Sequence, residues 1–128
     1  MSNFSSSNVE AGPEQELASS PTVVLATRLA LRYTLEDEFV EILTRTHEVA
    51  RRSKGDMEGF YEGLLEAATW IRDHAHCADD RAVANLLAVA IEVDLARLRG
   101  DEEGARSADL RGREAALEAR QALISFLR

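Results

Sequence analysis

The sequence predicts an all-α protein, a compact bundle of four to five helices built from two αα-hairpins. Three observations indicate this class. Apolar residues make up 45% of the 128 residues, but aromatic residues only 5%, and such Ala- and Leu-rich compositions favour helix over strand. Both prolines, Pro13 and Pro21, lie near the start, so nothing forbids long helices afterwards. Beyond them, apolar residues recur at spacings of three and four.

The first part of the chain predicts an arm followed by one or two helices. Residues 1–19 carry three acidic and no basic side chains among Ser, Asn and Gly, so we expect a flexible arm, with the helical bundle domain over 20–128. Ser20 and Pro21 suit the N-cap and first position of a helix. Thr34, followed by three acids, suits a second start. The pattern fits either a short helix over 21–33 and a longer one over 35–53, or one continuous helix.

A short motif, Gly-Asp-x-Glu-Gly, occurs at 55–59 and again at 100–104. Its first glycine suits the left-handed end of one helix, its Asp suits the N-cap of the next, and its Glu complements the helix dipole. We therefore expect a tight turn at each copy. The two turns divide the chain into hairpins over about 34–77 and about 80–128, with the last helix running to the C-terminus.

The second hairpin contains the most apolar helix and a stripe of small residues. The segment 82–91 is apolar nearly all round, which predicts that the helix over 80–99 is surrounded by protein. The last helix carries a column of small side chains that ends in one aromatic. We expect this column to pack closely against another helix; it comprises Ala105, Ala108, Gly112, Ala115, Ala119, Ala122 and Phe126.

A second column on the last helix alternates arginine with leucine or isoleucine, which a pure core does not do. This interaction seam comprises Arg106, Leu110, Arg113, Leu117, Arg120, Ile124 and Leu127. An acidic face on the helix over 57–76 has the opposite charge and comprises Glu58, Glu62, Glu66 and Asp73. One interpretation is that both are solvated surfaces. The other is that the two meet, within the chain or between two copies.

Reactive side chains gather at the end of the same helix, in His74, His76, Cys77, Asp79 and Asp80. All are metal-ligand types, but His74 and His76 point about 200° apart on a helix. No CxxC or HExxH spacing occurs, and histidines in a last turn complement the dipole. We therefore predict a capping cluster and no cofactor, with a metal or redox site as the alternative. His47, near Tyr33, Tyr61 and Trp70, is interpreted as a packing residue rather than the base of a small pocket.

Charge and motif content favour a non-enzymatic function. A net charge of −8 argues against nucleic acid as a direct ligand. One cysteine, no signal peptide and no apolar run long enough for a bilayer predict a cytoplasmic protein without membrane contact. We expect a protein-interaction, adaptor or regulatory module, a homodimer formed through the C-terminal helix. The alternative is a small helical subunit or inhibitor of a nucleoprotein assembly.

Overall fold

The computed structural model describes residues 21–52 and 55–127, and the predicted arm over 1–19 lies outside the described residues. Within these ranges the chain forms six α-helices and no strand, so the all-α prediction is confirmed, and the structure has one helix more than the upper end of the predicted four to five. The helices are α3 (Pro21–Leu31), α4 (Asp37–Arg52), α5 (Met57–His74), α6 (Ala78–Leu98), α7 (Glu102–Glu118) and α8 (Arg120–Leu127).

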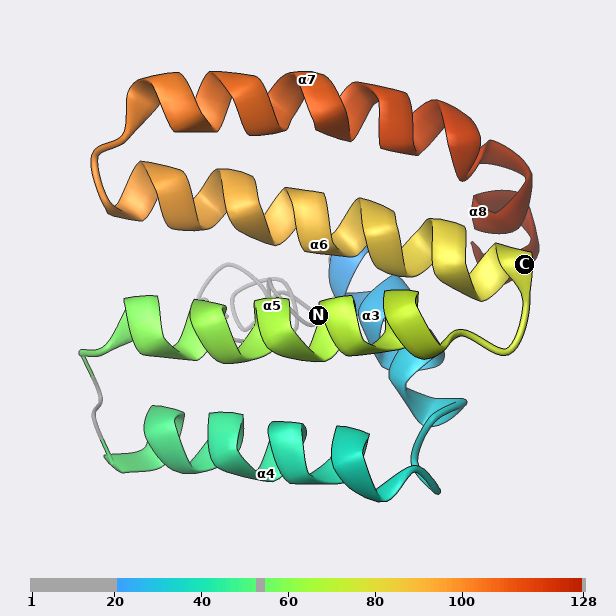
Figure 1. Cartoon of the computed structure of the whole chain (residues 1–128), viewed down its shortest axis with the longest axis horizontal. Helices are drawn as coiled ribbons and strands as arrows, with labels where there is room; N and C mark the ends of the chain where they lie inside the picture. The colour runs from blue at the N-terminus through green and yellow to red at the C-terminus, as the bar shows by residue number, and fades with distance from the viewer. Residues whose placement is uncertain (1–20, 53–54, 128) are drawn as a thin grey trace, which may run out of the picture.

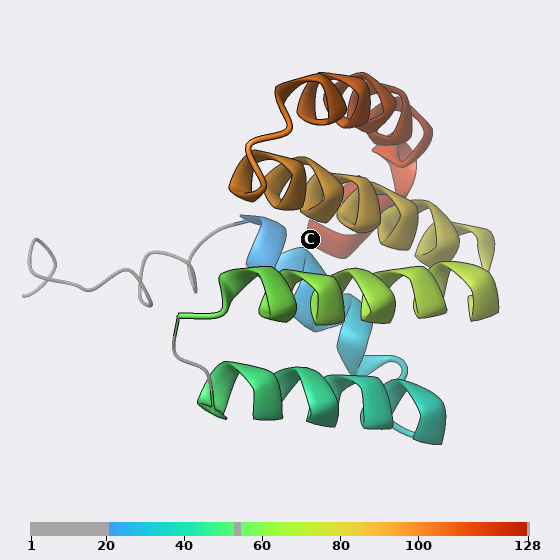
Figure 2. The same ribbon diagram turned by 60° about the vertical axis from the view of Figure 1, so that its left-hand side comes forward.

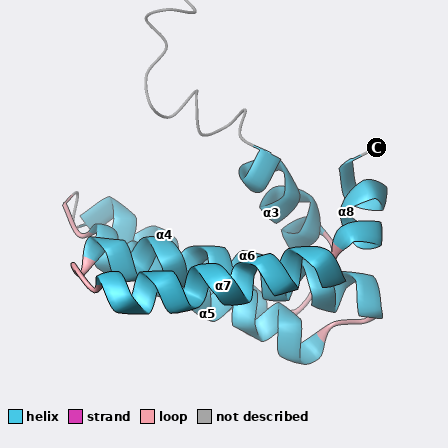
Figure 3. Cartoon of the chain, turned by 90° about the horizontal axis from the view of Figure 1, so that it is seen from above, coloured by secondary structure: helices cyan, strands magenta, loops and turns pink. Residues whose placement is uncertain are grey.

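Four of the helices form one layer. Figure 1 shows α4, α5, α6 and α7 side by side in chain order, with successive helices antiparallel. Each contacts only its neighbours within this layer, as in repeat arrays. The remaining helices, α3 and α8, contact each other and α6 and lie together on one side of the layer (Figure 3). Turning the molecule shows α3 crossing behind the layer at an angle (Figure 2).

Helix α6 is the centre of this architecture, as its apolar composition predicts. It contacts α5 and α7 along the layer and α3 and α8 on one side. Its side chains Val83, Ala84 and Ala88 have no exposed surface. Because alanines line much of α6, neighbouring helix backbones approach it closely. The small-residue column on α7 and α8 is buried as predicted, apart from a half-buried Gly112.

The repeated motif forms the two predicted N-caps. The Asp56 carboxylate accepts the Gly59 N–H at 2.8 Å, and the Asp101 carboxylate accepts the Gly104 N–H at 2.9 Å. The two copies differ at their first glycine. Gly100 has a φ of +74° and is the only described glycine with positive φ, so the prediction of a left-handed Gly55 is wrong. The turn between α4 and α5 is therefore built differently from the turn between α6 and α7.

Two predicted helix boundaries are corrected. The first two helices are separate, but α4 begins at Asp37 and Thr34 does not cap it. Instead the Thr34 hydroxyl donates to the Leu31 carbonyl at 3.2 Å, which closes the preceding turn. The last helix does not run straight to the C-terminus, because the chain bends at Ala119 and continues as α8. The bend lets Phe126, only 4% exposed, pack against α3 beneath the Arg32 guanidinium.

Candidate functional site

The edge helix α7 presents an apolar column to solvent. Leu110 is 61% exposed and Leu117 72% exposed, on the side of α7 opposite the buried small residues. Arg106 and Arg113 lie beside this column and are also exposed. We call these four residues the α7 outer face. It forms the first part of the predicted seam, and α7 has a layer neighbour only on its α6 side.

The remaining seam residues belong to another helix. Arg120 and Ile124 lie on α8, beyond the bend at Ala119, and the side chain of Leu127 lies outside the described residues. Ile124 is 47% exposed. Since α8 turns toward α3, the predicted seam is not one straight column (Figure 3). The continuous exposed part of the predicted seam is the α7 outer face.

The two flanks of the α7 outer face differ in charge. At about 100° per residue, Arg106 and Arg113 lie about 40–60° to one side of Leu110, and Glu114 lies about 40° to the other. The basic flank is on the α3 side of the layer, because Arg113 lines the same groove as Thr22 of α3. Arg113 also lies 3.4 Å from the Asp109 carboxylate in an exposed i,i+4 pair, which contributes only a few tenths of a kcal/mol.

The predicted acidic face pairs with other arginines. Arg99, at the end of α6, lies 3.3 Å from Glu58 and 2.9 Å from Glu62. Arg45 of α4 lies 3.0 Å from Glu66, and its hydrogen bond to this carboxylate is the main cause that raises the pKa of Arg45. Asp73 lies 3.4 Å from Arg72 on its own helix. Because α6 separates α5 from α7, the acidic face and the seam do not meet within the chain.

A buried polar centre joins the α3–α4 turn to the start of α6. Asp80 is 2% exposed and accepts hydrogen bonds from the Arg32 guanidinium and the Tyr33 hydroxyl, both at 2.7 Å. The Tyr33 hydroxyl in turn accepts the His76 N–H at 2.9 Å. Burial raises the pKa of Tyr33 to about 12, and hydrogen bonding to Asp80 adds to the shift. Each polar group in this centre has a partner, so it is a structural clasp.

The predicted His/Cys/Asp cluster is dispersed around this clasp. The His74 ring stacks on Trp70 with centroids 4.3 Å apart, and His76 Nε2 lies 3.4 Å from a Glu36 carboxylate oxygen. Cys77 and Asp79 are exposed, and Asp80 is occupied by the clasp. Among residues 21–52 and 55–127, no three His, Cys, Asp or Glu side chains are grouped to hold a metal ion.

His47 does not join Tyr33 and Trp70 in a small pocket, the alternative to the packing role that we predicted. It is exposed on α4, while Tyr33 and Trp70 pack edge-to-face with each other at 6.2 Å, near the other two histidines. The clasp was not predicted from the sequence. The only sequence signal for it is an acid two positions before the most apolar helix segment, where a buried carboxylate needs a basic partner from elsewhere.

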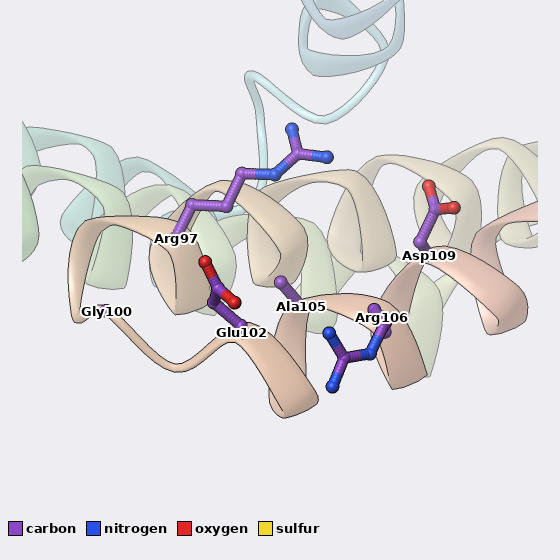
Figure 4. Close-up of a pocket in the computed structure, with 6 residues that line it drawn as sticks. All are labelled: Arg97, Gly100, Glu102, Ala105, Arg106 and Asp109. Atoms are coloured by element: carbon purple, nitrogen blue, oxygen red, sulfur yellow. The ribbon is translucent and has the colours of Figure 1, made fainter.

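A shallow groove runs between the end of α6 and the start of α7. Figure 4 shows its charged side chains, with Arg97 and Glu102 at one end and Asp109 farther along α7. Ala105 is buried beneath them. The lining holds two arginines and two acids in an open surface, with no hydroxyl, thiol or imidazole among its side chains. The groove therefore borders the α7 outer face and is lined mainly by charged side chains.

No protein-family model, curated protein or solved structure matches this chain. None of the described helices combines the length and the apolar composition that crossing a membrane requires.

Proposed function

We propose that this protein is a non-enzymatic interaction module that self-associates through its C-terminal region, with the α7 outer face as the contact surface. The observation that carries the proposal is the exposure of Leu110 and Leu117 on one side of an edge helix. The two leucines are seven residues apart and so lie about 10 Å apart on the same face. A neighbouring helix that covered them would remove both side chains from water.

The composition of the face supports a protein partner. Arginine stems cover apolar surface while their charged heads stay hydrated, and arginine is enriched at protein interfaces. The small-residue side of α7 is already used for packing on α6. The outer face is therefore the side of α7 left for a second molecule. Because this face is short, we expect a weak, reversible association.

The clasp and the dispersed histidines support a non-enzymatic function. Asp80, Tyr33 and Arg32 satisfy one another, and His74 and His76 contact Trp70 and Glu36. These polar groups lock one end of the layer in place. The rigid layer would then hold α7 in position as a preformed binding surface.

Substituting Leu117→Asp tests the proposal. Since Leu117 is 72% exposed, the variant should keep its helical circular dichroism and become monomeric in sedimentation equilibrium. The wild-type protein should associate at concentrations up to about 1 mM, the range of a weak interface. Leu35→Asp is the matched control, because Leu35 is 94% exposed in the α3–α4 turn, away from α7. Equal association of Leu117→Asp and wild type would refute the proposal.

A further inference from the structure

The partner that best fits the α7 outer face is a second copy of the same chain in parallel orientation. We infer that two α7 helices pair side by side about a two-fold axis that runs along them, with Arg113 of one copy facing Glu114 of the other. This inference rests on the proposed function and adds the identity and direction of the partner. It depends on the unequal charge of the two flanks of the leucine column.

Charged side chains of opposite sign flank the leucine column. Arg106 and Arg113 lie on the α3 side of the column, and Glu114 and Glu118 lie on the opposite side, about 40° and 80° from Leu110. Arg111, farther round that side, is held by Glu92 of α6 at 2.9 Å. The second flank therefore presents free carboxylate charge close to the leucines.

The symmetry of the pair decides which flanks meet. A two-fold axis along the helices places the basic flank of each copy against the acidic flank of the other, on both sides of the leucine column. A two-fold axis perpendicular to the helices gives an antiparallel pair and places like flanks together, with Arg113 of one molecule beside Arg113 of the other. Opposite charges across an interface favour association and like charges oppose it, so the parallel pair is preferred.

The parallel pair also fixes the register of the two helices. In the parallel pair each residue lies level with the same residue of the second molecule, so Leu110 meets Leu110 and Leu117 meets Leu117. Arg113 and Glu114 differ by one residue, about 1.5 Å along the axis, so both cross-pairs form at once. The exposed Asp109–Arg113 contact at 3.4 Å is weak enough to yield to them.

Room for the second copy follows from the layer. The bend at Ala119 turns α8 toward α3, so neither helix covers the α7 outer face (Figures 1 and 3). Under the two-fold axis, α3 and α8 of the two copies lie on opposite sides of the joined layers. The resulting assembly continues the layer from α7 into the α7 of the second copy.

Disulfide trapping tests the direction. Two single-cysteine variants are made in a Cys77→Ser background, one with Leu110→Cys and the other with Leu117→Cys. The two proteins are mixed, oxidised gently and analysed by mass spectrometry. The parallel pair predicts that each engineered cysteine forms a disulfide with the same position in a second molecule, giving 110–110 and 117–117 products. A predominant 110–117 product would show antiparallel pairing and overturn the inference, while the proposed function would stand.

Charge exchange supplies the second test, by sedimentation equilibrium on the uncrosslinked protein. Arg113→Glu and Glu114→Arg should each weaken self-association by about tenfold, and the double variant Arg113→Glu/Glu114→Arg should restore it. A double variant no better than the single ones would overturn the pairing. If wild type fails to associate, or Leu117→Asp has no effect, the proposed function itself fails.

Discussion

The Tyr33 hydroxyl donates a hydrogen bond of 2.7 Å to the Asp80 carboxylate, and both side chains are almost completely buried. The same carboxylate binds Arg32, so one acid connects the α3–α4 turn to the first turn of α6. A buried carboxylate is tolerated only when its charge and lone pairs are satisfied, as they are here. The clasp therefore depends on all three side chains.

Removing the acid should destabilise the fold. Asp80→Ala leaves the Tyr33 hydroxyl and the Arg32 guanidinium without their acceptor, and we expect a loss of about 2–4 kcal/mol in the free energy of unfolding. Urea denaturation measures this loss. Asp79→Ala is the control, because Asp79 is exposed in the same helix turn and should change stability by less than about 0.5 kcal/mol. Similar losses in both variants would contradict the clasp.

Alkaline pH should weaken the same clasp. The pKa of Tyr33 is raised from 10.0 to about 12, so the folded protein retains this proton where the unfolded chain loses it. This proton contributes about 3 kcal/mol to the free energy of unfolding. The contribution is fully present below pH 10 and is lost as the pH rises toward 12. Tyrosinate absorbance during alkaline titration should show one late component. That component should be absent in Tyr33→Phe. If it persists in this variant, it does not come from Tyr33.

The approach of α4 to α5 should depend on Gly63. A Cβ added at Gly63 would lie 2.8 Å from Thr46 Cγ2 and closer still to the Thr46 hydroxyl oxygen. Gly63→Ala should therefore cost about 1–3 kcal/mol through overpacking. Gly112→Ala is the matched control, because its Cβ would meet only Val89 at 3.5 Å, an ordinary contact. There alanine should stabilise the helix by about 0.5–1 kcal/mol, and thermal unfolding distinguishes the two signs.

The two copies of the repeated motif should respond differently to the same substitution. Gly100 has a φ of +74°, so Gly100→Ala forces a left-handed alanine and should cost about 1 kcal/mol. Gly55 lacks a positive φ, and a Cβ added there would meet nothing within 4 Å, so Gly55→Ala should be close to neutral. Chemical denaturation of the two variants compares them directly. Equal costs would indicate that the turns share one conformation in solution.

The sequence was most informative where local chemistry decides the structure. The all-round apolar character of α6 predicted its central position, because such a helix must be enclosed. The Asp56 and Asp101 caps were predictable because a cap needs only residues within one turn. The small-residue column identified the packed side of α7 for the same reason. The spacing of these small residues follows from the periodicity of a single helix and needs no knowledge of distant residues.

Three of the missed features depend on residues far apart in the chain. The bend at Ala119 has no proline or glycine to signal it and is held by Phe126, whose carbonyl accepts a hydrogen bond from Arg28, 98 positions earlier. Asp80 resembled an ordinary first-turn acid, because its burial depends on Arg32, 48 positions earlier. The predicted seam was divided for the same reason, since its periodicity continues through a bend that only tertiary packing imposes.

The way Arg32 joins α3, α6 and α8 has a consequence for the order of folding. Its guanidinium contacts both Asp80 and the Phe126 ring, and so needs the first, middle and last described helices in place together. The layer from α4 to α7 needs only pairings between consecutive helices, which close short loops and form quickly. We therefore expect the layer to assemble first and the two ends of the chain to lock onto it last.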